Sequence, residues 1–368
     1  MRIIQLTSSS AGGVARHARQ VAELFAPDHQ VILAGPAEVI AHAPVPSRLI
    51  DIADRPRASD LTALRELRAV ARGADIVHAH GLRAGAAAVI ATRGLARRPA
   101  VIVTLHNLPV GGRRVQRIAG MLELICARGA DRVLGVSGDL VARLTARGAQ
   151  DAQRALVPAP PRPQTSGIQP AAIRAELGLS NRDPLVVTVA RLAPQKGLDL
   201  LCDAAALLQQ DNRFRDPATG QLRWAVVGDG PLAGELRERV ARDRLPIMML
   251  GPRDDVADLM AAADVVVSTS TWEGQPLVVQ EALHVGAAIV ATAVGGTAEV
   301  TGPAAELVAP TGPDISAGIT AVLSEESRRT ELRRAARQRA TRLPGPADMR
   351  RQLAEIYDAA HGARSATR

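Results

Sequence analysis

The sequence predicts an α/β fold: two Rossmann-like α/β/α domains that face each other across a cleft. Short runs of Val, Ile and Leu alternate with longer amphipathic segments that contain several arginines. This pattern is typical of parallel strands covered by helices. The alternation stops in a proline-rich stretch at residues 158–170 and then restarts. The 368 residues suit two domains of ordinary size better than one core.

The first half alternates five strands with five helices. Leu61, Leu64, Leu67 and Val70 recur every three residues, which marks one face of a helix. The strands are expected at Arg2–Leu6, Gln30–Ala34, Asp75–His78, Ala100–Leu105 and Arg132–Val136, and the helices after Gly13 and at Leu61–Arg72, Gly81–Ala91, Gly112–Arg128 and Asp139–Arg147.

The prolines at 158–170 are tolerated by neither a helix nor a central strand, so this stretch is interpreted as the interdomain linker. The later strands are expected at Leu185–Ala190, Trp224–Gly228, Ile247–Leu250, Val265–Ser268 and Ala288–Thr292, and the helices at Gly197–Gln209, Leu232–Arg242, Val256–Ala262, Leu277–Val285, Asp314–Leu323, Arg328–Arg342 and from about Ala347 to His361. We therefore expect an N-terminal domain over 1–160 and a C-terminal domain over 170–343. A final helix within 347–368 is expected to pack back on the first domain.

The composition is globular and basic, with 47% apolar residues and a net charge of +8. That charge fits nucleic acid, an anionic membrane or phosphate-bearing substrates. Aromatic residues make up only 1%, too few for a base-stacking platform, and no recognition module is present, so no nucleic-acid partner is expected. Lys196 is the only lysine, and an arginine excess of this kind is also typical of a GC-rich genome.

Two observations bear on the compartment. Cys126 and Cys202 lie far apart and outside any metal-binding spacing, so both are expected to be reduced thiols. The N-terminus reads as a strand, and the longest uncharged stretch, residues 282–298, holds His284 and three glycines. We expect a cytoplasmic protein, with peripheral contact at the inner face of the membrane as an open alternative.

Ligands of open parallel sheets bind beyond the carboxyl ends of the strands. Arg191 and Lys196 lie there, between a strand and a helix, where cations stabilise charge on a departing diphosphate. Solvated loop cations are the alternative. Glu273 follows another strand in the same way. The N–H groups of Gly274, Gln275 and Leu277 can point at an anion or at sugar hydroxyls, and Pro276 can open the next helix, which carries Glu281.

Further candidates lie at other strand ends. The pair Gly12 and Gly13 would let backbone approach a phosphate or an acceptor. Gly228 and Gly230 follow a strand and are expected to line the nucleotide, as is Arg253 one strand later. His106 ends a strand in the first half, and His78 and His80 flank another strand end. Tight turns and structural strand-end histidines are the alternatives.

Several of these segments form motifs of a known family. The stretch Val189–Asp199, with Arg191 and Lys196, and the stretch Glu273–Leu283, with glutamates at both ends of an E-x7-E spacing, resemble the family-4 glycosyltransferases. Gly228-Asp-Gly-Pro231 and Gly295-Gly-Thr-Ala-Glu299 also fit. The resemblance implies the GT-B fold, a nucleotide-sugar donor and retention of the anomeric configuration.

The resemblance also implies roles for single residues. Arg191 and Lys196 would contact the diphosphate, Glu273 the donor sugar and Glu281 the ribose. His106 would lie near the transferred sugar. Gln275 stands where the family more often has an aromatic residue. No Asp-x-Asp pair is present and no carboxylate or cysteine joins the histidines, so we expect no metal and no zinc ligand among them.

The function predicted from these observations is metal-independent transfer of a hexose from a UDP- or GDP-sugar to a sugar, lipid-linked or small-molecule acceptor. An arginine patch would suit a lipid phosphate or an anionic membrane; its members are Arg65, Arg68, Arg72, Arg93, Arg97 and Arg98. Two other functions stay open: a nucleotide-sugar epimerase of the same fold, and a catalytically silent sugar-nucleotide-binding protein. The oligomeric state is open too.

Overall fold

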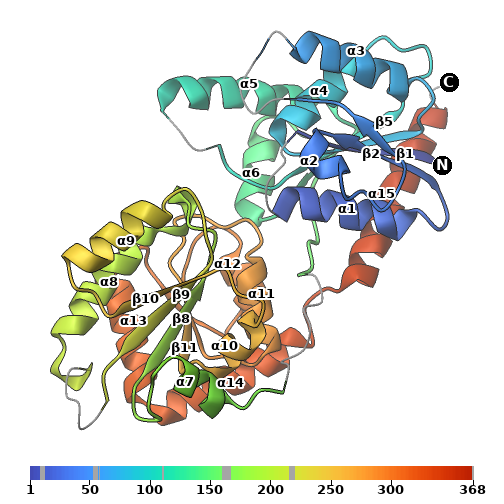
Figure 1. The fold of residues 1–368 in the computed structure, drawn as a ribbon. Helices are drawn as coiled ribbons and strands as arrows, with labels where there is room; N and C mark the ends of the chain where they lie inside the picture. The colour runs from blue at the N-terminus through green and yellow to red at the C-terminus, as the bar shows by residue number, and fades with distance from the viewer. Residues whose placement is uncertain are drawn as a thin grey trace. The chain divides into compact units, whose positions relative to one another are not determined.

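The computed structural model describes residues 1–8, 13–52, 57, 59–109, 112–159, 167–214 and 220–366. The chain divides into two compact units. Unit 1 combines residues 1–157 with 344–368, and unit 2 is the continuous stretch 158–343 (Figure 1). Each unit contains one parallel sheet with helices on both faces.

Unit 1 is built on a seven-stranded parallel sheet in the order β3-β2-β1-β4-β5-β6-β7. Its elements are β1 (Arg2–Thr7), α1 (Gly13–Phe25), β2 (Gln30–Gly35), α2 (Ala37–Ile40), β3 (Ser47–Leu49), α3 (Asp60–Ala71), β4 (Ile76–His80), α4 (Leu82–Thr92), β5 (Ala100–Leu105), α5 (Arg113–Gly129), β6 (Arg132–Gly135), α6 (Gly138–Ala146), β7 (Ala152–Arg154) and, from the far end of the chain, α15 (Pro346–Ala366). The central strands β1, β4 and β5 are almost wholly buried, as strands covered on both faces must be.

The two faces of the central strands of unit 1 differ in polarity. Val103 packs towards α4, where its methyl groups would meet a Cβ added at Gly85. Because side chains alternate along a strand, Thr104 faces the other way, towards α1 and α15. That second face carries buried polar groups at the centre of the sheet; they are Gln5, His78, His80 and Thr104. The last helix, α15, contacts both β5 and α1 (Figure 1).

Unit 2 is built on a six-stranded parallel sheet in the order β10-β9-β8-β11-β12-β13. Its elements are α7 (Pro170–Glu176), β8 (Leu185–Val189), η1 (Pro194–Lys196), α8 (Leu198–Gln210), η2 (Asn212–Phe214), β9 (Arg223–Val227), α9 (Ala233–Arg242), β10 (Ile247–Gly251), α10 (Val256–Ala262), β11 (Val265–Ser268), α11 (Leu277–His284), β12 (Ile289–Thr292), α12 (Thr297–Thr301), β13 (Glu306–Val308), α13 (Gly312–Ser324) and α14 (Glu326–Ala340). One apolar cluster joins the sheet to α8, α9 and α13, and a second joins its other face to α7, α10 and α11 (Figure 1).

Both sheets reverse their strand order at one point, between β1 and β4 in unit 1 and between β8 and β11 in unit 2. This arrangement is the Rossmann-like, doubly wound topology, and ligands of such sheets bind beyond the carboxyl ends of the strands at the reversal. The predicted fold class is confirmed. In unit 2 the loops that begin at Ala190 and Thr269 lie at that place, and in unit 1 Ser8 and Gly81 do.

Short edge strands are the main elements that the sequence did not indicate. β3, β7 and β13 have three residues each, too few for hydrophobic alternation to be recognised. Another difference concerns β4, which runs on to His80, so that His78 lies within the strand and His80 is its last residue. The spacing of two places both histidines on one face of the sheet.

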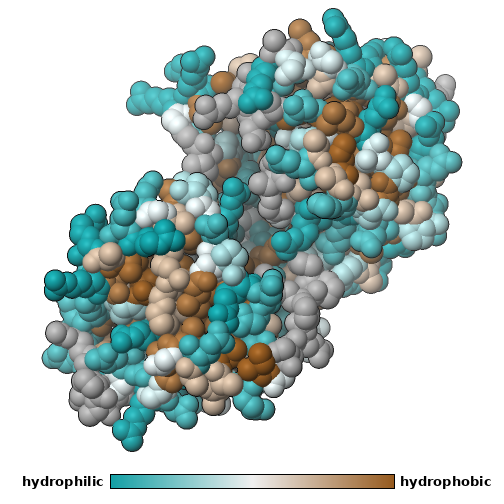
Figure 2. Space-filling view, viewed as in Figure 1, coloured by the Kyte–Doolittle hydropathy of each residue, from teal (hydrophilic) through white to brown (hydrophobic). Residues whose placement is uncertain are grey.

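The surface is mixed in polarity. In Figure 2 hydrophilic side chains are spread over both units, with exposed apolar side chains in smaller groups between them. Across the described ranges of the chain, no helix is both long enough and apolar enough to span a bilayer.

Candidate active site

In unit 2 the loops that follow β8 and β11 are joined to each other. The N–H of Thr271 donates to the carbonyl oxygen of Gln195 at 2.9 Å, and the amide of Gln195 donates to the carbonyl oxygen of Trp272 at 2.8 Å. The hydroxyl of Thr269 donates to the carbonyl oxygen of Lys196 at 2.8 Å. These bonds bring the two predicted motifs, which are far apart in sequence, into one site.

Lys196 and Glu273 form an ion pair at the centre of this site. The carboxylate of Glu273 is 7% exposed and also accepts a hydrogen bond from the hydroxyl of Ser270 at 2.6 Å. The backbone of Glu273 is fixed as well, because its carbonyl oxygen accepts from the N–H of Gly296 at 2.8 Å. A buried carboxylate that is paired and hydrogen-bonded holds the ammonium in one place. Glu273 is therefore both a candidate sugar ligand and the residue that positions Lys196.

Arg191 lies at the start of the same loop and is exposed. Its guanidinium has no ion-pair partner among the residues that the structure describes. An exposed cation at the carboxyl end of a strand is available to an anionic ligand. Arg253, predicted to line the nucleotide, is differently placed: it forms a bidentate ion pair with Asp255, at 2.8 and 2.6 Å, and a further bond of 2.8 Å to Glu176. Hydrogen bonding to Asp255 and then Glu176 raises the pKa of Arg253, and its charge is largely neutralised by these partners.

Close backbone contacts between loops explain the predicted glycines of unit 2. Gly228 has φ of +128°, and a Cβ there would lie 2.0 Å from the carbonyl oxygen of Ala190. A Cβ at Gly230 would lie 2.4 Å from the carbonyl oxygen of Leu192. Both glycines thus let the loop after β9 pass directly against the loop that carries Arg191. This geometry assigns them a part in shaping the site, and contact with the nucleotide stays a prediction.

The helix α11 begins next to Glu273. Gly274 and Pro276 are buried, Gln275 and Leu277 are half-buried, and Pro276 is the N-cap of the helix. The first N–H groups of a helix lack partners within it, so its N-terminus attracts anions and hydroxyl oxygens. Glu281, in the second turn of α11, is 7% exposed.

In unit 1 the structure brings together three histidine rings from different segments: His17 of α1, His80 at the end of β4, and His106, which follows β5. Their ring centroids lie between 5.1 and 5.7 Å apart. Burial lowers the pKa of His17 to about 4 and the pKa values of His80 and His106 well below their usual range. All three rings are therefore neutral at physiological pH.

His17 was not among the candidate residues predicted from the sequence. It lies one helical turn beyond Gly13 in α1, and 63 residues separate it from the next of the three histidines, so only the fold brings them together. Gly13 itself is exposed at the first position of α1, and Gly12 falls outside the described residues.

A hydrogen-bonded chain behind the histidines ties β1, β4 and β5 to α15. His80 Nε2 lies 2.8 Å from Gln5 Oε1, and the amide nitrogen of Gln5 donates to the hydroxyl of Tyr357 at 2.9 Å. That hydroxyl lies 2.7 Å from His78 Nδ1, and His78 Nε2 lies 2.7 Å from Thr104 Oγ1. His78 is thus a fully bonded structural residue. Its pKa falls to about 3 because of burial and the neighbouring His17.

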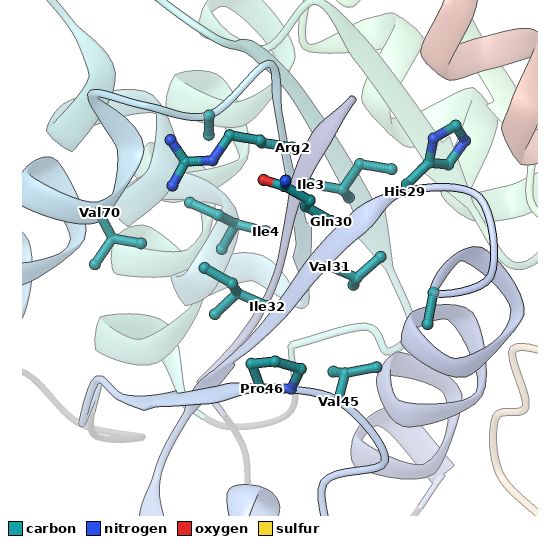
Figure 3. A pocket seen from close by; sticks show the side chains of 12 residues that line it. Arg2, Ile3, Ile4, His29, Gln30, Val31, Ile32, Val45, Pro46 and Val70 are labelled. Atoms are coloured by element: carbon teal, nitrogen blue, oxygen red, sulfur yellow. The ribbon is translucent and has the colours of Figure 1, made fainter.

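A separate cavity of about 400 Å³ lies at the amino-terminal ends of the strands in the unit 1 sheet (Figure 3). It is lined by the first residues of β1 and β2, among them Ile4 and Ile32, together with Val45, Pro46 and Val70. These residues lie at the amino-terminal ends of the strands, whereas His80 and His106 lie at the carboxyl-terminal ends. The cavity therefore does not belong to the site that the motifs define.

Two α/β units of reversed strand order, each with polar residues at the carboxyl ends of its strands, are the architecture of the GT-B fold. Comparison with known proteins agrees. Residues 12–160 match the family described as glycosyl transferase 4-like domain, and residues 170–339 match glycosyl transferases group 1. The chain belongs to this family of glycosyltransferases.

Curated relatives include two bacterial enzymes. The UDP-Gal:alpha-D-GlcNAc-diphosphoundecaprenol alpha-1,3-galactosyltransferase of Escherichia coli is 27% identical over 233 residues, which are 60% of this chain and 58% of the relative. A D-inositol 3-phosphate glycosyltransferase of Geodermatophilus obscurus is 32% identical over 270 residues, 68% of this chain and 59% of the relative. The match thus spans about three fifths of the length of these relatives.

Solved structures share the fold over the whole chain. Anabaena Alr3699/HepE in complex with UDP-glucose has a TM-score of 0.79 at 22% identity and covers 98% of this chain and 100% of its own. WaaG, a glycosyltransferase involved in lipopolysaccharide biosynthesis, has a TM-score of 0.69 at 16% identity, with 97% and 99% covered. At these identities the likeness shows the GT-B fold.

Proposed function

We propose that this protein transfers a hexose from a UDP-sugar to an acceptor hydroxyl with retention of the anomeric configuration. The observation that carries the proposal is the Lys196–Glu273 pair, held between the loops after β8 and β11 beside the exposed Arg191. UDP is the proposed nucleotide because one relative is named for a UDP-galactose donor and a structural neighbour holds UDP-glucose.

In the proposed reaction the protein supplies position and charge. Arg191 and Lys196 stabilise the negative charge that grows on the diphosphate as the bond to the sugar breaks. Glu273 binds donor-sugar hydroxyls and keeps Lys196 in place, while Glu281 accepts from the ribose hydroxyls. His106 lies near the transferred sugar. The departing phosphate oxygen takes the acceptor proton. With two cations at the diphosphate, the transfer step is proposed to need no metal there.

The first prediction concerns the charge at the diphosphate. Lys196→Ala should lower turnover by about 10²–10³-fold, the loss typical of removing one preorganised charged group. It should also abolish the rise in melting temperature that UDP produces in the wild type. Both are measured on the purified protein with UDP, GDP, ADP and their common sugars, each in EDTA and in Mg²⁺. Arg242→Ala is the matched control, since Arg242 is exposed and pairs with its neighbour Asp243.

Removing Lys196 leaves the buried carboxylate of Glu273 uncompensated, which lowers stability by itself. The double variant Lys196→Ala/Glu273→Gln removes that charge and should also fail to respond to UDP. If no nucleotide raises the melting temperature of the wild type, the proposed site is wrong. If the product has the inverted anomeric configuration, the proposed mechanism is wrong. Conversion of the donor without any acceptor would favour the epimerase alternative.

We also propose that the protein works at the inner face of the membrane on a lipid-linked acceptor, as the name of the E. coli relative suggests. The predicted arginine patch does not carry this proposal: Arg68 donates to the carbonyl oxygens of Ala91 and Arg93, at 2.8 and 2.7 Å, and Arg98 donates to that of Gly129 at 2.6 Å.

The helix α5 is a better candidate for membrane contact. Four apolar side chains are exposed along it at successive three-residue steps; they are Val115, Ile118, Met121 and Leu124. Residues three apart are neighbours on a helix surface, so the four form a continuous stripe. Exposed arginines flank its first turns at Arg113, Arg114 and Arg117. An apolar stripe edged by arginine is typical of helices that lie on anionic membranes.

A further inference from the structure

His17, His80 and His106 have the arrangement of a metal site. One ring nitrogen of each lies within 4.8 Å of the corresponding nitrogens of the other two. His80 Nδ1 and His106 Nε2 are 3.4 Å apart. That separation is long for a hydrogen bond. It equals the edge of a tetrahedron of nitrogens about 2.0–2.1 Å from a central Zn²⁺, which is roughly 3.4 Å.

The surroundings of His80 fix the direction of its free lone pair. Gln5 Oε1, 2.8 Å from His80 Nε2, can only accept, so the proton of the ring lies on Nε2. Nδ1 then carries a lone pair and is the atom that lies towards His106. Metal-bound histidines are usually held in this way, with the second ring nitrogen donating to an oxygen. The amide of Gln5 is itself held by Tyr357, so the whole support is buried and bonded.

His17 contributes the third ring and a buried polar atom that has no explanation otherwise. Its side chain is 3% exposed, and its Nδ1 has no hydrogen-bond partner among the described residues. Buried polar atoms of this kind are uncommon and point to a role or a ligand. His106 is only half-buried, so the cluster can be reached from solvent.

Neutral imidazoles are the form of histidine that binds metals. The donor set also selects the ion. Three imidazoles without a carboxylate suit Zn²⁺, Co²⁺ or Ni²⁺ and not Mg²⁺ or Ca²⁺, which need oxygen ligands.

We propose that His17, His80 and His106 bind one divalent transition-metal ion, with Zn²⁺ preferred, and leave its fourth position open. From the sequence we expected no zinc ligand among His78, His80 and His106, because no carboxylate or cysteine joins them. The fold provides one in His17 and shows His78 to be engaged with Tyr357 and Thr104. The site is in unit 1, whereas the proposed diphosphate ligands are in unit 2, so it adds no metal to the diphosphate contacts proposed above.

The experiment is a titration of metal-stripped protein, carrying no polyhistidine tag, with Co²⁺ and with Zn²⁺. We expect one equivalent of Co²⁺ to give the visible absorption of a tetrahedral complex, and one equivalent of Zn²⁺ to displace it. His17→Asn and His106→Asn should lose this absorption, while His42→Asn, an exposed histidine in the same unit, should keep it. Gln5→Leu should weaken metal binding by about 10–100-fold, the usual effect of losing such a support.

A second measurement guards against variants that fail to fold. In the wild type, Zn²⁺ should shift the imidazole nuclear magnetic resonances of His17, His80 and His106. Those of the four distant histidines, His29, His42, His284 and His361, should stay in place. Absence of stoichiometric Co²⁺ or Zn²⁺ binding to the wild type would overturn the proposal, and so would unchanged binding by folded His17→Asn.

Occupancy should also slow sugar transfer, because the ion would hold His106 away from the donor sugar; this consequence alone rests on the proposed function. Zn²⁺ binding without any response to UDP would contradict the proposed function and leave the metal site standing. A response to UDP without Zn²⁺ binding would contradict the metal site and leave the proposed function standing.

Discussion

At the scale of single residues, Gly295 shows how tightly the candidate active site is built. Its φ is +50°, and a Cβ there would lie 1.9 Å from the carbonyl oxygen of Glu273. The loop after β12 therefore rests directly on the backbone of the residue that pairs with Lys196. The next residue, Gly296, donates its N–H to the same carbonyl oxygen. Glu273 is thus held by backbone contacts that no side chain could replace.

Gly295→Ala should destabilise unit 2 by more than about 1–2 kcal/mol, the cost of a left-handed alanine, because the contact with Glu273 adds to it. It should also weaken the response to UDP. Gly234→Ala is the control: Gly234 lies in α9, a Cβ there meets nothing within 4 Å, and alanine should raise stability by up to about 1 kcal/mol. Urea unfolding followed by circular dichroism measures both. Equal stability of the two variants would contradict this account of the loop.

Motif spacing identified candidate residues but not their partners. Lys196 and Glu273 were predicted to bind different parts of the donor, which stays a prediction. Their mutual ion pair could not be predicted, because it depends on how two loops meet across the sheet reversal. Arg253 shows the same limit: its neighbour Asp255 is visible in sequence, but Glu176 comes from a distant helix.

At the scale of elements, α5 combines two features that usually exclude each other in a soluble helix: it is long, and it exposes apolar side chains. Met121 is 65% exposed, more than any other large apolar residue in the described part of the chain. Exposed apolar groups arranged as a continuous stripe mark interaction surfaces, whereas single ones do not.

The double variant Ile118→Ser/Met121→Ser should therefore reduce binding to vesicles that contain anionic phosphatidylglycerol, measured by co-sedimentation. Loss of one exposed apolar side chain in unit 2, Leu207→Ser on α8, should leave binding unchanged, since Leu207 is exposed without such a stripe. Binding should fall as salt rises, because the flanking arginines contribute through screened charge. Equal binding by both variants would rule out α5 as the membrane contact.

Helices and central strands of this chain were predictable because their apolar period extends over enough residues. β5 and β8 were predicted at or within one residue of their observed bounds. The three-residue edge strands were not, and α12, with five residues, was missed for the same reason. The end of β4 was misplaced because alternating histidines lack the apolar character by which a buried strand is recognised, although both are buried.

At the scale of the whole molecule, the chain leaves unit 1, forms unit 2 and returns as α15. Unit 1 depends on that return. Met349, Leu353 and Ile356 of α15 are buried, and each contributes about 2 kcal/mol by burial. Together with the Tyr357 network this is comparable to the entire stability of an ordinary domain, about 5–15 kcal/mol.

Residues 158–343 expressed alone should therefore fold and unfold cooperatively on heating, whereas residues 1–157 alone should not. Joining 1–157 to 344–368 through a short flexible linker should restore a folded unit 1. Circular dichroism melting curves of the three fragments test this. A stable, cooperative transition for residues 1–157 would show that α15 is dispensable.

The aromatic side chains are divided between the units in a way that reports on each separately. The chain has one tyrosine and two tryptophans. Tyr357 lies buried in unit 1, while Trp224 and Trp272 both belong to unit 2, the latter directly before Glu273. Tryptophan fluorescence therefore follows unit 2 alone, and Trp272 lies beside the proposed nucleotide-sugar site. Tyrosine absorption reports on the packing of α15 in unit 1, because Tyr357 is buried there. The native protein therefore carries an intrinsic optical probe of each unit.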